Sequence, residues 1–165
     1  KAAKDPKLSS VLSGDDDIAS IKRIERYTTV YVVEKDGQMD TLIMPVRGYG
    51  LWSTLYGFIA IKGDLNTVAG MGFYQHAETP GLGGEVDNPK WKAQWLGKTL
   101  FDENGKLSVA VVKGGVDPQS PNAVHQVDAL AGATLTSKGV DNLLNFWLGQ
   151  NGFGPFIANL RAGEA

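Results

Sequence analysis

The chain has 165 residues, of which 42% are hydrophobic and 21% charged, enough for one domain with a hydrophobic core. Its net charge of −2, with no long run of lysine or arginine, gives no indication of nucleic-acid binding. Because cysteine is absent, disulfides, cysteine-ligated metal or iron–sulfur clusters and a cofactor linked to cysteine are excluded.

The first 26 residues predict a lead-in before the main domain. Residues 1–17 are polar and end in three aspartates, so we expect a loose segment with one short helical turn. Residues 18–26 place isoleucines three apart among charges, which favours a short helix, although the flanking residues also allow a strand. The first residue is Lys1 rather than Met, which is typical of a fragment or a processed form.

A first hairpin is predicted at the start of the main domain. Residues 28–34 are rich in β-branched and aromatic side chains, which favours a strand. Asp36-Gly37 is a hairpin turn signal, and the returning strand is expected over residues 39–46, closed by Pro45 and Gly48. These features indicate antiparallel pairing.

A second hairpin and a loop follow. Residues 56–62 and 67–76 predict two strands joined by a turn at residues 64–66. The next stretch, residues 78–85 with the sequence ETPGLGGE, contains Pro80 and three glycines, so no regular element is expected there. Such a loop can lay its backbone along a flat ligand, and a plain turn is the alternative.

The next predicted elements are a helix and a third hairpin. The helix is expected from Asn88 to about Leu96 and presents Trp91 and Trp95 on one face, as core residues. The hairpin is expected over residues 100–113.

Two helices complete the predicted domain. Residues 140–148 show the spacing of an amphipathic helix, which should end at Gly149. Residues 153–160 predict a short final helix. The sum is an α+β fold, with mostly antiparallel β hairpins forming a sheet and a few packed helices, as a single domain over residues 27–165.

The stretch directly before the amphipathic helix, residues 128–137 with the sequence DALAGATLTS, is the main candidate site. It brings the hydroxyls of Thr134, Thr136 and Ser137 to a helix start, where unpaired N–H groups and a partial positive charge suit a phosphate group. Gly132 allows a ligand to approach the backbone closely. The plainer alternative is that Thr136 or Ser137 is an N-cap.

Other chemistries find little support. The two histidines, His76 and His125, lack a second ligand at metal spacing and are interpreted as surface or hydrogen-bonding residues, so no metal site is expected. The chain contains neither a Gly-x-Ser-x-Gly elbow nor a Walker-type phosphate loop.

Residues 128–137 resemble the flavinylation motif of the FMN-binding domain family, in which a threonine carries FMN through a phosphoester bond. More narrowly, residues 50–56 (GLWSTLY), 78–85 and 146–156 resemble the C subunits of Na⁺-translocating NADH:quinone oxidoreductases. The resemblance extends from about Tyr27 to the C-terminus. Two features depart from the family, namely Ala131, where serine is commoner, and the absence of the family's N-terminal membrane helix.

The resemblance implies that Thr134 carries FMN, attached by a separate metal-dependent flavin transferase with FAD as donor. The loop should lie along the flavin ring, with Leu82 as an apolar contact, Trp52 as a stacking or edge neighbour and Lys113 beside the pyrimidine. Asp128 opens the motif and is expected to hold its turn. The residues expected to bind the cofactor are Trp52, Glu78, Thr79, Pro80, Gly81, Leu82, Gly83, Lys113, Asp128, Gly132, Ala133, Leu135, Thr136 and Ser137.

The implied function is that of an electron carrier in a membrane complex that oxidises NADH, reduces quinone and exports Na⁺. The implied partners are the other subunits of that complex and the transferase. The implied location is the bacterial inner membrane, with a single-pass anchor upstream and the domain on the periplasmic side. The alternatives are the G subunit of the homologous Rnf electron-transport complex and a non-redox binding module whose Thr134 is never modified.

Overall fold

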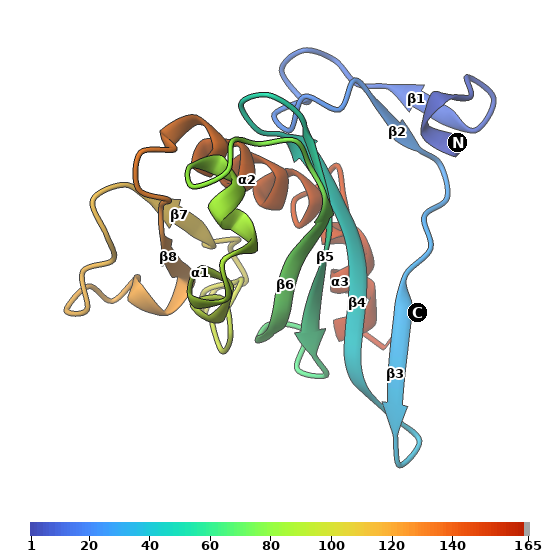
Figure 1. The fold of residues 1–165 in the computed structure, drawn as a ribbon. Coiled ribbons are helices and arrows are strands. Elements are labelled where there is room, and N and C mark those ends of the chain that lie inside the picture. Colours follow the sequence, from blue (N-terminus) through green and yellow to red (C-terminus); the bar gives the residue numbers. More distant parts are fainter. Residues whose placement is uncertain (164–165) are drawn as a thin grey trace.

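Figure 1 shows the computed structural model, which describes residues 1–163. The strands are β1 (Ser9–Val11), β2 (Arg23–Glu25), β3 (Tyr31–Lys35), β4 (Gln38–Tyr49), β5 (Thr54–Lys62), β6 (Val68–Gln75), β7 (Ala110–Val112) and β8 (Gln126–Asp128). The helices are α1 (Pro89–Ala93), α2 (Thr134–Trp147) and α3 (Gly154–Arg161), with 3₁₀ turns η1 (Ala2–Lys4), η2 (Gly83–Asp87) and η3 (Ala123–His125). The predicted α+β fold is confirmed.

The centre of the fold is an antiparallel sheet of order β3-β4-β5-β6. Along β4, Leu42, Met44 and Val46 are buried while the intervening residues are not, which is the period-2 pattern of a strand with one face on the core. Helix α2 packs on β4 and supplies the other half of the core through Leu143, Leu144 and Trp147.

The two predicted hairpins of this sheet are present. Asp36 and Gly37 both have positive φ, 54° and 76°, as a tight hairpin turn requires. The expected end of the returning strand was wrong, because β4 continues through Pro45 to Tyr49. Pro45 lies beyond the last residue that pairs with β3, so one side of the strand is open there and can accept a proline.

The lead-in is folded, so the expectation of a loose segment was wrong. Strands β1 and β2 pair antiparallel, and the helix expected over residues 18–26 is replaced by the strand alternative. The turn before β2 explains this, because the Asp17 carboxylate accepts the N–H groups of Ile21 and Lys22 at 2.8 and 2.7 Å. Lys22 also has a φ of 67°, which a helix does not allow.

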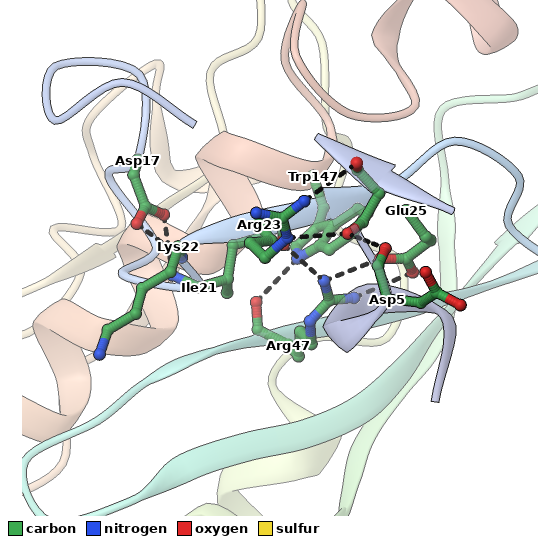
Figure 2. A network of polar contacts seen from close by, with 9 residues as sticks. Asp5, Asp17, Ile21, Lys22, Arg23, Glu25, Arg47 and Trp147 are labelled. Carbon is green, nitrogen blue, oxygen red and sulfur yellow. Dashed lines mark hydrogen bonds and ion pairs between the residues drawn. The ribbon is translucent and has the colours of Figure 1, made fainter. Parts of the chain in front are cut away.

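Arg47 of β4 fastens the lead-in to the domain (Figure 2). Its guanidinium donates to both carboxylate oxygens of Glu25, at 3.0 and 2.8 Å, and to the carbonyl oxygen of Arg23 at 3.0 Å. The same group lies 5.0 Å from the centre of the Trp147 ring, and the Trp147 indole N–H donates to the Arg47 carbonyl at 2.7 Å. Segments far apart in the sequence therefore meet at one side chain.

Helix α1 begins as predicted, with the Asn88 side chain accepting the Lys90 N–H at 2.9 Å, but it ends at Ala93 rather than Leu96. Trp91 and Trp95 are buried with their rings perpendicular at 5.7 Å, which confirms them as core residues.

The prediction of a third hairpin over residues 100–113 was wrong, because only one antiparallel bridge, between Phe101 and Leu107, forms there. Strand β7 pairs in parallel with β8 instead. A parallel partner joined by a long crossover leaves no local turn signal in the sequence.

The last two helices are confirmed. Helix α2 ends at Trp147, two residues before Gly149, and Gly149 does not have a positive φ. A Cβ at Gly149 would lie 2.6 Å from the Asn145 carbonyl oxygen, so close approach is the reason for this glycine. Helix α3 covers the predicted final segment. Within residues 1–163, no helix is both long and apolar enough to cross a bilayer.

Candidate functional site

The candidate site is centred on the first turn of α2. Thr134 is the first helical residue and its side chain is exposed, while the preceding Ala133 is the N-cap and has no side chain that can cap. Within residues 1–163, the N–H groups of Thr134, Leu135 and Thr136 have no acceptor, and the first helical bond runs from the Ser137 N–H to the Ala133 carbonyl. An exposed hydroxyl therefore lies beside three free donors at the positive end of a helix dipole.

The other two hydroxyls of the motif are committed elsewhere. Thr136 Oγ1 donates to the Glu78 carboxylate at 2.7 Å, and the side chain of Thr136 is almost fully buried. Ser137 Oγ donates to the Ala133 carbonyl and accepts the Leu130 N–H, both at 2.9 Å. Neither residue is the N-cap, so that alternative was wrong. Each hydroxyl already has a partner inside the fold, and the expectation that they face a phosphate stays a prediction.

Glu78 joins the motif to a distant turn. Its carboxylate accepts the N–H groups of Leu51, Trp52 and Ser53 at 3.0–3.1 Å, the Ser53 hydroxyl at 2.9 Å and the Thr136 hydroxyl. Burial raises the pKa of Glu78, but these hydrogen bonds, that of Thr136 first, outweigh it and leave the pKa below its ordinary value. Glu78 is therefore a charged group inside the site, and sequence reasoning assigned it as a cofactor contact instead.

The loop after β6 is more ordered than predicted. The Thr79 carbonyl accepts the Leu82 N–H at 3.1 Å around Pro80 and Gly81, whose φ is 76°, which is the pattern of a type II turn. A 3₁₀ helix, η2, then starts at Gly83, so the expectation of no regular element was wrong from that residue on.

This loop presents its later residues to the helix start. A Cβ at Gly132 would lie 3.2 Å from Leu82, and a Cβ at Gly83 would lie 2.5 Å from Thr136 Oγ1. Gly132 has a φ of 68°, which carries the chain into the helix in a conformation that favours glycine. The earlier residues 79–81 form the exposed tip of the turn, and their contact with the cofactor stays a prediction.

Three apolar side chains among the candidate residues are exposed. Leu82, Trp52 and Leu135 have exposed fractions of 44%, 64% and 59%. Leu51 and Leu135 also line a hollow of about 220 Å³ between the turn after β4 and α2. Larger cavities of about 400 and 500 Å³ lie beside the lead-in, away from the motif. Another of about 440 Å³ is lined by Gln94, Val116 and Asp128, the residue that opens the motif.

Asp128 and Lys113 lie at the ends of the parallel pair. Asp128 Oδ1 accepts the Val116 N–H at 2.7 Å, and its backbone is held by the Gln94 and Trp91 side chains, so it orders the chain before the motif. Lys113 is exposed directly after β7, whose last carbonyl accepts the Ala129 N–H at 2.9 Å. Lys113 is thus near the start of the motif.

Sequence reasoning gave Ser53 no role and interpreted His76 as a surface or hydrogen-bonding residue, which its two hydrogen bonds bear out without the link to Glu78 having been expected. Ser53 donates to Glu78 and accepts the Ala77 N–H at 2.8 Å, and the His76 ring accepts the Glu78 N–H through Nδ1 at 3.1 Å. The only signal in the sequence was that both residues lie in or beside stretches with the family resemblance. Within residues 1–163, no three His, Asp or Glu side chains gather as a metal site.

The residues present fit a covalently attached FMN. The three free N–H groups and the helix dipole can hold phosphate oxygens, and Thr134 offers the free hydroxyl. The carboxylate of Glu78 already accepts five hydrogen bonds from the protein, so it does not compete with a phosphate for the free N–H groups. The exposed Leu82 and Trp52 can pack against an apolar ring.

Known proteins share this architecture. The model of the FMN-binding domain family matches residues 50–149. The C subunit of the Na(+)-translocating NADH-quinone reductase of Pseudomonas aeruginosa is 76% identical over 165 residues, covering 100% of this chain and 63% of its own length. The corresponding protein of Yersinia pestis is 49% identical over 164 residues, covering 99% of this chain and 60% of its own length. This chain therefore spans less than two thirds of these curated relatives.

The crystal structure of Shewanella oneidensis NqrC superposes with a TM-score of 0.88 at 42% identity, covering 98% of this chain and 72% of that one. Such a match extends over both the lead-in and the helix start. Fold, family model and sequence identity agree, and this chain belongs to the FMN-binding domain family and, within it, to the NqrC subunits of Na⁺-translocating NADH-quinone reductases.

Proposed function

We propose that this chain carries FMN on Thr134 through a phosphoester bond and relays electrons within a Na⁺-translocating NADH-quinone reductase. The observation that carries the proposal is the exposed Thr134 hydroxyl beside three N–H groups that lack an acceptor within residues 1–163. The hydroxyls of Thr136 and Ser137 already have partners inside the fold, which supports Thr134 as the attachment residue.

In the attachment step, the Thr134 hydroxyl oxygen would attack the FMN phosphorus of FAD and lose its proton, the bond from that phosphorus to the bridging oxygen would break, and AMP would leave. A separate metal-dependent flavin transferase performs this transfer. The free N–H groups of the first helical turn would hold the remaining phosphate oxygens, and the helix dipole would stabilise their charge. Gly132 leaves room for this group beside the backbone.

The bound flavin supplies one- and two-electron chemistry. The chain contributes the position and the environment, with the Leu82 side chain and the Trp52 ring as apolar contacts and Lys113 as a candidate cation on the preceding segment. A reduced, negatively charged ring is stabilised by a cation and destabilised by a carboxylate, so Lys113 and Glu78 act in opposite directions.

The activity of the complex and its location are part of the same proposal. We expect the chain to work with the other subunits in oxidising NADH, reducing quinone and exporting Na⁺. We also expect a membrane anchor upstream of Lys1 and the domain on the periplasmic side of the bacterial inner membrane. The relatives described above are C subunits of the reductase, which favours this proposal over the G subunit of the Rnf complex.

The test is co-expression of the chain with its transferase, followed by a denaturing gel under ultraviolet light and mass measurement of the intact chain. Wild type should show a fluorescent band and the added mass of FMN minus water. Thr134→Ala should lose both, whereas Thr136→Ala should retain some of the flavin. Flavin mapped to a residue other than Thr134 would refute the attachment, and an unmodified wild type would support the non-redox alternative.

A further inference from the structure

Glu78 is a buried carboxylate that lies between two segments of the site. One oxygen, Oε1, accepts the N–H groups of Trp52 and Ser53 and the Ser53 hydroxyl, all at 2.9–3.0 Å. The other, Oε2, accepts the Leu51 N–H at 3.1 Å and the Thr136 hydroxyl at 2.7 Å. With five donors on two oxygens, the carboxylate has no remaining acceptor directed at a ligand.

The backbone around Glu78 is shaped to admit the carboxylate. A Cβ at Gly50 would lie 2.7 Å from Oε1, and a Cβ at Gly83 would lie 3.0 Å from Oε2 and 2.5 Å from Thr136 Oγ1. Any side chain at these positions would push the carboxylate out of place. The two glycines therefore belong to the same arrangement, one on each side of it.

The main chain of Glu78 is fixed as well. Its N–H donates to His76 Nδ1 at 3.1 Å, so that nitrogen carries no proton. The other ring nitrogen, Nε2, then bears the proton and donates to the Asp87 carboxylate at 2.7 Å. The Ser53 hydroxyl also accepts the N–H of Ala77, the residue before Glu78, at 2.8 Å. This bond joins the turn of residues 51–53 to the segment that carries Glu78.

We infer that Glu78 is a positioning residue that fixes the turn carrying Trp52 relative to the first turn of α2, and with it the place of the flavin ring. The inference deepens the proposed function and rests on it for the flavin. The five donors around this position require two oxygens that both accept hydrogen bonds, and a glutamate carboxylate provides them. A glutamine would turn an NH₂ group towards N–H donors, and an aspartate is one methylene shorter.

A purely structural role would predict a different pattern. A buried carboxylate that only stabilised the fold would, on replacement, lower the stability of the whole domain and leave the flavin environment of the folded fraction unchanged. A positioning residue acts locally instead. Its replacement should release the turn of residues 51–53 while the central sheet stays protected, and should change the flavin that the turn faces.

The first arm measures amide hydrogen exchange by NMR in protein made without the transferase. In Glu78→Gln, the amides of Leu51, Trp52 and Ser53 should exchange about tenfold faster or more, because bonds to a charged acceptor are the stronger kind. Amides of β4 and β5 serve as the internal reference and should stay within about twofold of wild type. Thr136→Val is the matched control, because it removes one donor from the same carboxylate and leaves the three amide bonds in place.

The second arm uses protein loaded with flavin by the transferase. In Glu78→Gln, the visible circular dichroism of the flavin should change, and its midpoint potential should become more positive because a fixed negative charge near the ring is lost. Thr136→Ser, which keeps the hydroxyl donor, should restore the wild-type dichroism that Thr136→Val alters. Glu78→Asp retains the charge and should shift the potential less than Glu78→Gln.

Two results would overturn the inference. The first is unchanged exchange at residues 51–53 in a folded Glu78→Gln. The second is faster exchange together with a flavin spectrum and potential equal to wild type. Should Glu78→Gln fail to fold, Glu78→Asp takes its place in the exchange arm, because its carboxylate is one methylene shorter and cannot keep all three amide bonds. If wild-type protein co-expressed with the transferase carried no flavin, the proposed function would be refuted. The hydrogen-exchange experiment would still decide whether Glu78 holds the turn of residues 51–53.

Discussion

Arg47→Met tests how the lead-in is held. This change removes the guanidinium and keeps the aliphatic stem packed against its surroundings. It leaves the Glu25 carboxylate without its counter-ion and the Arg23 carbonyl without a donor, and it removes the contact with the Trp147 ring. We expect the β1–β2 hairpin to separate from the sheet before the sheet itself unfolds (Figure 2).

The expected loss in the free energy of unfolding follows from the burial of the Arg47–Glu25 ion pair. The side chains of Arg47 and Glu25 are 16% and 13% exposed, so the pair lies nearer to a buried than to a surface salt bridge. Removal of one partner from a buried pair costs about 3–5 kcal/mol, whereas a surface pair is worth at most about 1. We therefore expect Arg47→Met to cost about 3 kcal/mol. The double variant Glu25→Gln/Arg47→Met should lose less, about 1–2 kcal/mol, because no unpaired charge remains.

The pH dependence follows from Glu25. Burial raises the pKa of Glu25, but its hydrogen bonds, that of Arg47 first among them, outweigh burial and leave the pKa below its ordinary value of 4.5. The folded state therefore binds this proton less readily than the unfolded state. The stability that Glu25 contributes is fully present above about pH 4.5 and is lost as the pH falls through the folded pKa.

The assay combines urea unfolding, which gives the free energy, with amide exchange of β1 and β2, which reports local release of the lead-in. Glu25→Gln is the control, because it removes the negative charge of the same ion pair and keeps Arg47. If Arg47→Met and the double variant were equally stable, the unpaired Glu25 carboxylate would carry no cost, and the reasoning from burial would be refuted.

Three further predictions concern the site. Asp128→Ala should cost about 1–2 kcal/mol by leaving the Val116 N–H without its acceptor, and should lower flavin incorporation; equal stability by urea unfolding would contradict this. Leu82→Asp should make the flavin potential more negative while attachment persists, and an unchanged potential in a redox titration would put the ring elsewhere. Gly83→Ala should lower the melting temperature because its Cβ would meet side-chain oxygens, whereas Gly70→Ala, with open space around it, should not.

Sequence patterns correctly predicted the parts of the fold that depend on interactions between residues close together in the chain. The hairpin turn at Asp36-Gly37 depends on two residues that tolerate positive φ, and the apolar spacing of α2 depends on one helix face. In each case the physical cause lies within about a dozen residues of chain.

The errors came from contacts that are distant in the sequence. The lead-in is ordered by Arg47, which no pattern in residues 1–26 can indicate. The pairing of β7 with β8 joins strands on either side of a long crossover. The role of Glu78 depends on Thr136, 58 residues away, and the same bond removes a hydroxyl that looked free in the sequence. Only the folded chain shows which polar groups already have partners.

The first strand of the central sheet has a consequence for handling this protein. Strand β3 lies at the edge of the sheet, extends beyond the body of the fold in Figure 1, and is exposed along its whole length, including Tyr31, Val32 and Val33. An open edge with apolar residues can pair with the same edge of another molecule and start aggregation. The bulge between Val33 and Glu34 and the charge of Lys35 interrupt that edge, so they act as the built-in protection against such association at high concentration.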